Sequence, residues 1–133
     1  EEYAIKDSRI RVIHNEVNQK LPNSLNIGFR QAKGEFLTWT SDDNLYLPEA
    51  IEKMQFFLCK NIDVGLVFTD MNYIDDSGMV ISSNSRSCHK INLCNCVGAS
   101  FMYRRDVADN VGEYDNSKIL IEDYDYWIRV YSK

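Results

Sequence analysis

The feature that most constrains the fold is the apolar run at residues 64–69, Val-Gly-Leu-Val-Phe-Thr, in which polar residues do not alternate with apolar ones. Such a run is typical of a strand that is covered on both faces. Helical and strand patterns alternate along the rest of the chain, with one inserted hairpin and no internal repeat. This order predicts an α/β fold with a mostly parallel sheet flanked by helices.

Periodicity and end signals place the other elements. Strands are expected at 9–13, 36–40 and 97–103, and helices at 3–8, at 21–32, from Pro48 through Leu58, at 105–111 and at 122–131. The sequence Asp-Ser-Gly at 76–78 predicts the turn of a hairpin over 73–80. In parallel sheets ligands bind beyond the carboxyl ends of the strands, so the residues after strand 36–40 are the first candidates for a site.

The composition is that of a globular protein, since 44% of the 133 residues are hydrophobic, and the formal charge is −5. A nucleic-acid partner is not expected, because binding a polyanion requires a basic face. No apolar run approaches the roughly 20 residues of a membrane span. Because the chain starts at Glu1 rather than at a methionine, residues 1–133 are expected to form a single, partial domain of a longer protein.

The four cysteines stand at positions 59, 88, 94 and 96, and no secretory segment is visible. The small number of cysteines and the lack of a visible secretory segment indicate a reducing compartment and reduced thiols. Cys88 and His89, together with Cys94 and Cys96, could instead be zinc ligands. Zinc sites usually show two paired spacings, and this stretch offers one Cys-x-Cys, so zinc is the less favoured interpretation.

Asp42 and Asp43 follow the predicted strand 36–40 and are the strongest candidates for a metal site. Mg²⁺ and Mn²⁺ prefer oxygen ligands and complete their shells with water and substrate phosphates, so one or two carboxylates suffice. The alternative is an Asx turn that leads into the helix at Pro48, and the dipeptide alone does not decide between them. The other Asp-Asp pair, at 75–76, precedes Ser-Gly and is expected to form a hairpin turn instead.

Glu122 and Asp123 stand at the start of the predicted helix 122–131. Free N–H groups and the helix dipole stabilise a carboxylate at such a position. An ionised carboxylate can accept a proton from an attacking hydroxyl. The alternative, which the residues alone favour, is simple capping of the helix, with Trp127 and Ile128 in the core.

The remaining candidates are weaker. Lys20 precedes a predicted helix, where a cation could meet a phosphate, although most such lysines are solvated. Trp39 and Tyr46 flank the acidic pair and could stack on a sugar, but packing is the safer interpretation. His14 and His89 stand alone in the sequence and are expected on the surface or in loops.

Four ordered stretches resemble family 2 glycosyltransferases of the GT-A fold, including the spore-coat polysaccharide type. The stretches are Leu-Asn-Ile-Gly at 25–28 with Ala-Lys-Gly-Glu-Phe at 32–36, Thr-Ser-Asp-Asp-Asn at 40–44 with Pro48, Gly-Leu-Val-Phe-Thr-Asp at 65–70 leading to Asp-Ser-Gly, and Val-Gly-Ala-Ser-Phe-Met-Tyr-Arg-Arg at 97–105 followed by Glu-Asp-Tyr-Asp-Tyr-Trp at 122–127. No single stretch is specific, but the ordered set is. The resemblance implies a GT-A-like, Rossmann-like sheet.

The resemblance also implies an activity. A family 2 enzyme transfers a sugar, with inversion, from a nucleotide-diphosphate donor to a hydroxyl of a saccharide or lipid-linked acceptor, and a UDP-sugar is the donor expected here. Cell-surface polysaccharide synthesis is the expected process. Because nucleotide sugars are cytoplasmic, the protein is expected in the cytoplasm, peripheral at the inner membrane face.

Roles for individual residues follow from the same resemblance. Asp43 is implied to bind the divalent metal, Mn²⁺ or Mg²⁺, and Asp42 to contact the ribose or support the metal. Asp123 is implied to be the catalytic base, with Glu122 beside it in the catalytic site. Two further residues are implied in nucleotide binding, Lys20 and Asn26.

The chain also departs from the family pattern. Thr40 stands where many relatives carry a further aspartate. The N-terminal strands that hold the nucleotide base and the C-terminal acceptor region are not part of this sequence. The isolated chain is therefore expected to show weak or no turnover and to form a homodimer through the surface that truncation exposes.

Two rival functions remain open at the level of sequence. One is a nucleotide-sugar or carbohydrate-binding module without catalysis, in which Asp123 only caps a helix. The other is a nucleotidyltransferase-like enzyme, which also uses metal-binding carboxylates but normally has a glycine-rich, basic loop near its start. The Glu-Asp-Tyr-Asp-Tyr-Trp stretch favours sugar transfer over the nucleotidyltransferase, whereas the effect of Asp123→Asn on turnover would distinguish the binding module.

Overall fold

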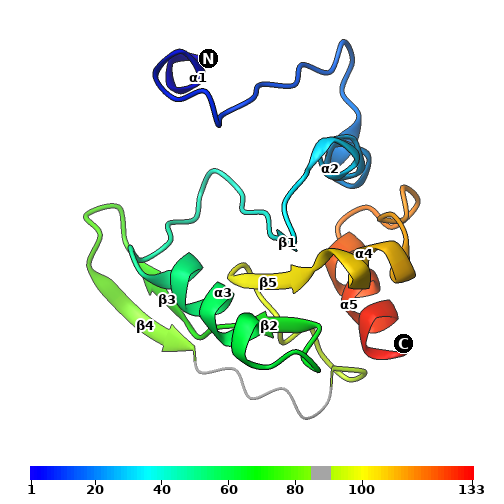
Figure 1. The fold of residues 1–133 in the computed structure, drawn as a ribbon. Helices are drawn as coiled ribbons and strands as arrows, with labels where there is room; N and C mark the ends of the chain where they lie inside the picture. Colours follow the sequence, from blue (N-terminus) through cyan, green and yellow to red (C-terminus); the bar gives the residue numbers. More distant parts are fainter. Residues whose placement is uncertain (85–90) are drawn as a thin grey trace.

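The computed structural model describes residues 1–84 and 91–133 (Figure 1). Its elements follow in the order α1 (Glu2–Lys6), α2 (Lys20–Gln31), β1 (Phe36–Leu37), α3 (Ala50–Lys60), β2 (Leu66–Phe68), β3 (Met71–Ile74), β4 (Val80–Asn84), β5 (Phe101–Arg104), α4 (Arg105–Val111) and α5 (Glu122–Tyr131). Within these ranges, no helix combines the length and the apolar character needed to cross a membrane.

The main sheet has the strand order β1-β5-β2 and is antiparallel throughout. Leu37 of β1 pairs with Tyr103, and Val67 of β2 pairs with Met102. The prediction of a mostly parallel, Rossmann-like sheet is therefore not confirmed for the described strands. Since β1 and β2 are both antiparallel to β5, they run in the same direction, as the helix between them suggested. They do not pair because β5 lies between them.

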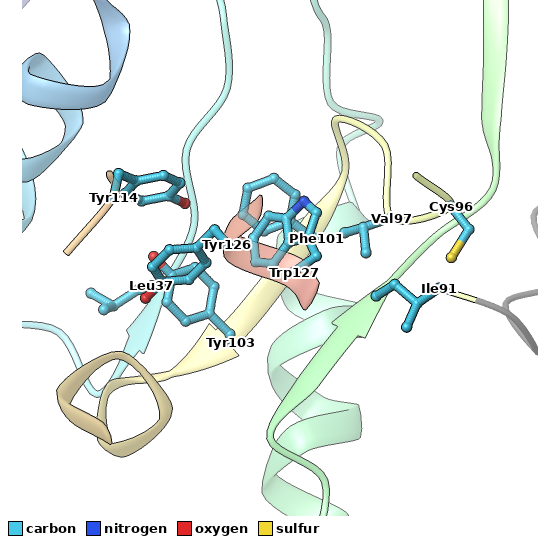
Figure 2. Close-up of a cluster of buried hydrophobic side chains, with 9 residues drawn as sticks. All are labelled: Leu37, Ile91, Cys96, Val97, Phe101, Tyr103, Tyr114, Tyr126 and Trp127. Atoms are coloured by element: carbon cyan, nitrogen blue, oxygen red, sulfur yellow. The ribbon is translucent and has the colours of Figure 1, made fainter. Parts of the chain in front are cut away.

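The first three of the four residues of β5 are buried, and they divide the core into two parts. Phe101 and Tyr103, each 1% exposed, point to one side of the sheet and join the larger aromatic cluster (Figure 2). Met102 lies between them in sequence and packs on the other side with Met54 and Leu58 of α3. This alternation is the two-residue period of a strand, and it lets one short strand serve both faces of the sheet.

Helix α5 completes the larger cluster. Trp127 is fully buried, and its ring packs edge-on against Phe101 with a centroid distance of 4.6 Å. Tyr126 stacks on Tyr114 at 4.1 Å. The prediction of Trp127 as a core residue is confirmed. The same prediction for Ile128 is wrong, because this side chain is 39% exposed on the outer side of α5.

The predicted hairpin forms between β3 and β4, which are antiparallel. One carboxylate oxygen of Asp75 accepts hydrogen bonds from the backbone N–H groups of Ser77, at 2.9 Å, and Met79, at 3.0 Å. Gly78 supplies the positive φ of 83° that the turn requires. Hydrogen bonds from Ser77 lower the pKa of the Asp75 carboxyl. The Asp-Asp pair at 75–76 therefore forms a turn, as predicted.

Other boundaries differ from the predictions. Strands were expected at 36–40 and 97–103, but β1 ends at Leu37 and β5 begins at Phe101. Residues 9–13 do not form a strand in the structure; they belong to a segment that runs away from the sheet (Figure 1). Alternation alone does not create a strand, because a strand also needs a neighbour that accepts its hydrogen bonds. Within this segment the guanidinium of Arg11 donates a hydrogen bond to the backbone carbonyl of Gln31.

The cysteine predictions have a mixed outcome. Cys59 is an exposed free thiol, as expected for a reduced cysteine. Cys96 is disulfide-bonded, so the prediction of reduced thiols is wrong at this position. Cys88 and His89, two of the four residues of the zinc alternative, lie outside the described residues.

Arg104, the last residue of β5, connects the sheet to the C-terminal end of α3. Its guanidinium donates hydrogen bonds to the backbone carbonyls of Leu58, Asn61 and Val64, the last at 2.8 Å. The carbonyls at a helix C-terminus lack partners within the helix, and a cation there also interacts favourably with the helix dipole. One side chain thus holds the helix against the strand.

We expect Arg104→Met to reduce the free energy of unfolding by about 2–3 kcal/mol, because it leaves these carbonyls without their charged donor. The control is Arg30→Met, which removes an ion pair with Glu113 whose two side chains are both more than half exposed. That change should cost no more than about 0.5 kcal/mol. Urea denaturation measures both values. Equal effects of the two substitutions would contradict the capping role of Arg104.

Candidate functional site

Asp42 and Asp43 lie in a tight turn that follows β1. Both side chains are exposed. One oxygen of Asp43 accepts hydrogen bonds from the amide of Asn44, at 2.8 Å, and from the hydroxyl of Ser41. The turn that was the alternative to a metal site is therefore present. It does not exclude the site, because the second Asp43 oxygen and the Asp42 carboxylate lie on the same solvent-facing turn.

Both ends of the acidic turn are anchored on β5. Thr38 precedes the turn, and its hydroxyl donates a hydrogen bond of 2.6 Å to the carbonyl of Phe101. Tyr46 follows the turn, and its hydroxyl lies 3.1 Å from the same Thr38 hydroxyl. These contacts explain why β1 is short: after Leu37 the chain is held to β5 by a side chain rather than by a strand ladder. The anchored ends hold Asp42 and Asp43 at the edge of the sheet.

Asp123 lies in the first turn of α5 and is half-buried. One carboxylate oxygen accepts a hydrogen bond from the N–H of Tyr124 at 2.7 Å, and the other accepts one from the side-chain amide of Asn95 at 2.8 Å. The residue at the N-cap position is Ile121, which makes no side-chain cap bond. Asp123 is therefore not a conventional N-cap, which was the alternative that the residues alone favoured.

Glu122 precedes Asp123 and is 7% exposed. Its Oε2 atom is buried and has no hydrogen-bond partner among the described residues. A buried carboxylate oxygen normally has a partner, because leaving it without one costs free energy. The position differs from that of the exposed pair Asp42 and Asp43, so the two acidic stretches offer carboxylates of different character.

Two aromatic side chains connect the acidic turn with α5. The indole N–H of Trp39, three residues before Asp42, donates a hydrogen bond of 2.9 Å to the hydroxyl of Tyr114. Tyr114 in turn stacks on Tyr126 of α5. Burial raises the pKa of the Tyr114 hydroxyl, and the nearby charge of Asp123 acts in the same direction. Tyr114 therefore contacts both Trp39, which precedes the acidic turn, and Tyr126 of α5.

Trp39 itself packs edge-on against Phe101, with a centroid distance of 5.8 Å, and Tyr46 packs against the smaller core cluster. Packing was the favoured interpretation of both rings, and the structure supports it. To stack on a sugar, each ring would need an open face, and the core covers part of both rings.

Asn26 of α2 is buried, with an exposed fraction of 2%. Its side-chain amide donates a hydrogen bond to the carbonyl of Tyr114, and its carbonyl oxygen accepts one from the N–H of Tyr114, both at 2.8 Å. The side chain thus forms a closed pair with one backbone unit, in the manner of a strand partner. This geometry favours a structural role over the nucleotide contact that was predicted.

Lys20, the first residue of α2, is exposed and has a φ of 59°. This left-handed conformation is uncommon for a residue with a Cβ atom. Its backbone N–H donates a hydrogen bond of 2.8 Å to the side-chain oxygen of Asn18. The structure therefore explains the position of Lys20 as a helix start, and its nucleotide contact stays a prediction.

The described residues contain no group of three or more histidine, cysteine or acidic side chains that could enclose a metal ion. Asp42 and Asp43 can still provide the one or two carboxylates that Mg²⁺ or Mn²⁺ takes from a protein when substrate phosphates complete the shell. Their exposure fits such an open site. The predicted metal ligands lie on a turn separate from the helix that carries Asp123, and their metal binding stays a prediction.

A cavity of about 330 Å³ lies between α2, α4 and α5. Asn26, Tyr103, Tyr114 and Tyr126 contribute to its walls, whereas neither Asp42 nor Asp123 does. The cavity is therefore separate from the two candidate acidic positions, Asp42 and Asp123.

Two residues of this region were missed by sequence reasoning, Asn95 and Tyr114. Asn95 stands between two cysteines in a stretch for which no helix or strand was predicted, and Tyr114 follows a glycine-ended helix, so neither carries a local signal. Their importance arises from contacts with residues that are 28 and 75 positions away.

Comparison with known proteins gives a consistent result. The family model described as glycosyl transferase family 2 matches residues 1–112. An uncharacterized glycosyltransferase of Methanocaldococcus jannaschii is 29% identical over 96% of this chain and 47% of its own length. Another, from Haemophilus influenzae, is 25% identical over 91% of this chain and 44% of its own length. The chain therefore spans about half the length of these curated relatives.

The closed pair between Asn26 and Tyr114 leads to a test of the role of Asn26. Asn26→Asp keeps the shape but replaces the donating amide by a buried carboxylate, so we expect the free energy of unfolding to fall by at least about 2 kcal/mol. Asn110→Asp, an exposed position on α4, adds the same charge and should change little. A stable Asn26→Asp variant with weakened UDP binding would instead support the predicted nucleotide contact.

Proposed function

The chain belongs to glycosyl transferase family 2, and from this premise we propose that the protein transfers a sugar from a nucleotide-diphosphate donor to a hydroxyl of an acceptor, with inversion. The observation that carries the proposal is the presence of two acidic sites of different character, one supported by β5 and the other on α5. An exposed aspartate pair is anchored on β5, and a half-buried aspartate with both oxygens hydrogen-bonded stands on α5. Sugar transfer requires these two functions, charge neutralisation and proton removal.

Asp43 and Asp42 would hold the divalent metal, Mn²⁺ or Mg²⁺, against the donor diphosphate. The metal supplies a positive charge that stabilises the departing nucleoside diphosphate. Within the chain, Ser41 and Asn44 fix one oxygen of Asp43 by hydrogen bonds, which leaves the other oxygen for the ion. Asp42, exposed on the same turn, is available to the metal or to the ribose.

Asp123 would act as the base that takes the proton from the acceptor hydroxyl. Its two existing hydrogen bonds leave acceptor capacity, because an ionised carboxylate offers about four lone-pair positions. The position at the first turn of α5 places its negative charge at the positive end of the helix dipole. Glu122, the buried residue that precedes Asp123, would be a second carboxylate in the catalytic site.

The proposal extends to partners and place. A UDP-sugar is the proposed donor, a saccharide or lipid-linked molecule the proposed acceptor, and cell-surface polysaccharide synthesis the proposed process. The proposed location is the cytoplasm, peripheral to the inner membrane face. We also propose a homodimer, because Ile10 and Val12, beside the main body of the chain, are 43% and 45% exposed.

The metal role is tested by calorimetric titration of UDP into the full-length protein with Mn²⁺ present. Asp43→Ala should weaken binding at least about tenfold, since it removes the main protein ligand of the ion. The control is Asp76→Ala, which removes an exposed aspartate from the other Asp-Asp pair and should bind UDP as the unmodified protein does. Equal, metal-dependent binding by Asp43→Ala would refute the assignment.

The base is tested with Asp123→Asn, which keeps the size of the side chain and removes its charge. Sugar transfer by the full-length protein should fall at least about 100-fold, whereas UDP binding should be unchanged, because general-base catalysis contributes roughly 10²–10⁴-fold. Asp125→Asn, on the same helix turn, serves as the control. Retained transfer by Asp123→Asn would contradict catalysis by this residue and would favour a binding module.

A further inference from the structure

Asn95 is the one side chain outside α5 for which the described structure gives a hydrogen bond to Asp123. Its amide nitrogen lies 2.8 Å from the Asp123 Oδ2 atom, and the two residues are 28 positions apart in the sequence. The other oxygen, Oδ1, receives the N–H of Tyr124. One donor therefore comes from the helix that carries the aspartate, and the second comes from a separate loop.

The loop that carries Asn95 is held firmly on the side of the core. Cys96 and Val97, the next two residues, are 6% and 0% exposed and belong to the larger aromatic cluster. Figure 2 shows both on the side of Trp127 that lies away from Tyr114. Since the backbone on one side of Asn95 is fixed by burial, its amide is not a mobile surface group, and it can determine the direction of the carboxylate that it contacts.

Two donors at two different oxygens restrict the rotation of a carboxylate about its Cβ–Cγ bond. The N–H of Tyr124 alone would leave the Oδ2 atom free to turn with the side chain. A base must lie within hydrogen-bond distance of the proton that it removes, and small misplacements are costly to the rate. A neutral amide is suited to this task, because it donates a hydrogen bond without neutralising the negative charge.

We propose that Asn95 is the positioning residue of the base, a neutral donor that holds Oδ2 so that Asp123 faces the acceptor hydroxyl. The proposal rests on the function proposed above for Asp123. Asn95 acts through Asp123 and forms no contact with the reacting atoms. Proton transfer stays between the acceptor hydroxyl and Asp123, so Asn95 neither gains nor loses a proton during the reaction.

Asn95→Asp is the sharpest variant, because it preserves the shape and replaces the donor by a second carboxylate facing Asp123. Like charges at this distance repel, so the base loses both its support and its orientation. We expect kcat of the full-length protein to fall roughly 10–100-fold while the KM for the donor changes less than about twofold. Asn92→Asp is the matched control, since it places the same charge at an exposed position of the same loop.

Further measurements distinguish a positioning role of Asn95 from a role in stabilising the fold. Asn95→Ala removes the donor without adding charge and should lower kcat about tenfold. In an Asp123→Asn background, neither change at Asn95 should lower kcat further, because the residue acts through the base. In the NMR spectrum, the side-chain amide signals of Asn95 should shift when Asp123 is replaced by Asn, a readout that does not depend on turnover.

The outcomes distinguish this inference from the function on which it rests. If Asp123→Asn abolishes transfer while both Asn95 variants keep the kcat of the unmodified protein, the positioning role is wrong and the base stands. If Asn95→Asp and Asn95→Ala lower kcat only in proportion to a loss of folded protein, seen as lowered melting temperature, Asn95 is a structural residue and the inference is overturned. If Asp123→Asn itself retains transfer, the proposed function fails first.

Discussion

The position of β5 between β1 and β2 is the constraint on which the rest of this structure depends. Two of its four residues pair with β1 and three pair with β2, Tyr103 with both, and three of the four are nearly inaccessible to solvent. Such a strand must supply side chains to both faces of the sheet. Phe101 and Tyr103 reach the aromatic cluster, and Met102 reaches α3. The chain is also closely packed where it enters β2, because a Cβ at Gly65 would lie 2.8 Å from the side chain of Val107 on α4.

The positions of the candidate site residues also depend on β5. The acidic turn is tied to the carbonyl of Phe101 through Thr38, and Arg104 holds α3 at the other end of β5. Tyr114 receives the indole N–H of Trp39 and stacks on α5, so the turn and the helix of Asp123 share a common aromatic support. Polar contacts between distant segments, rather than the secondary structure alone, determine where the carboxylates lie.

Much of the local structure could be predicted from residues close together in the sequence. The limits of α4 and α5 and the turn of the β3–β4 hairpin were predicted correctly, because the periodicity of a helix and the Asp-Ser-Gly turn depend on neighbouring residues. The strand predicted at 9–13 was wrong, because alternation indicates which side chains could share one face of a strand but not whether a neighbouring strand is present to pair with it. Sheet direction failed for a related reason: helix crossovers indicate which strands run in the same direction, not which strand lies between them.

For the site, the sequence by itself determined the chemistry: an aspartate pair after an apolar strand, a Glu-Asp pair at a helix start, and their order along the chain. These are covalent facts that no packing can change. Only the tertiary structure decided that the Asn26 side chain forms hydrogen bonds with the backbone of Tyr114, that Glu122 is buried, and that Asn95 contacts Asp123. Each of these depends on segments separated by many residues, whose approach is set by the burial of a shared core rather than by any local preference.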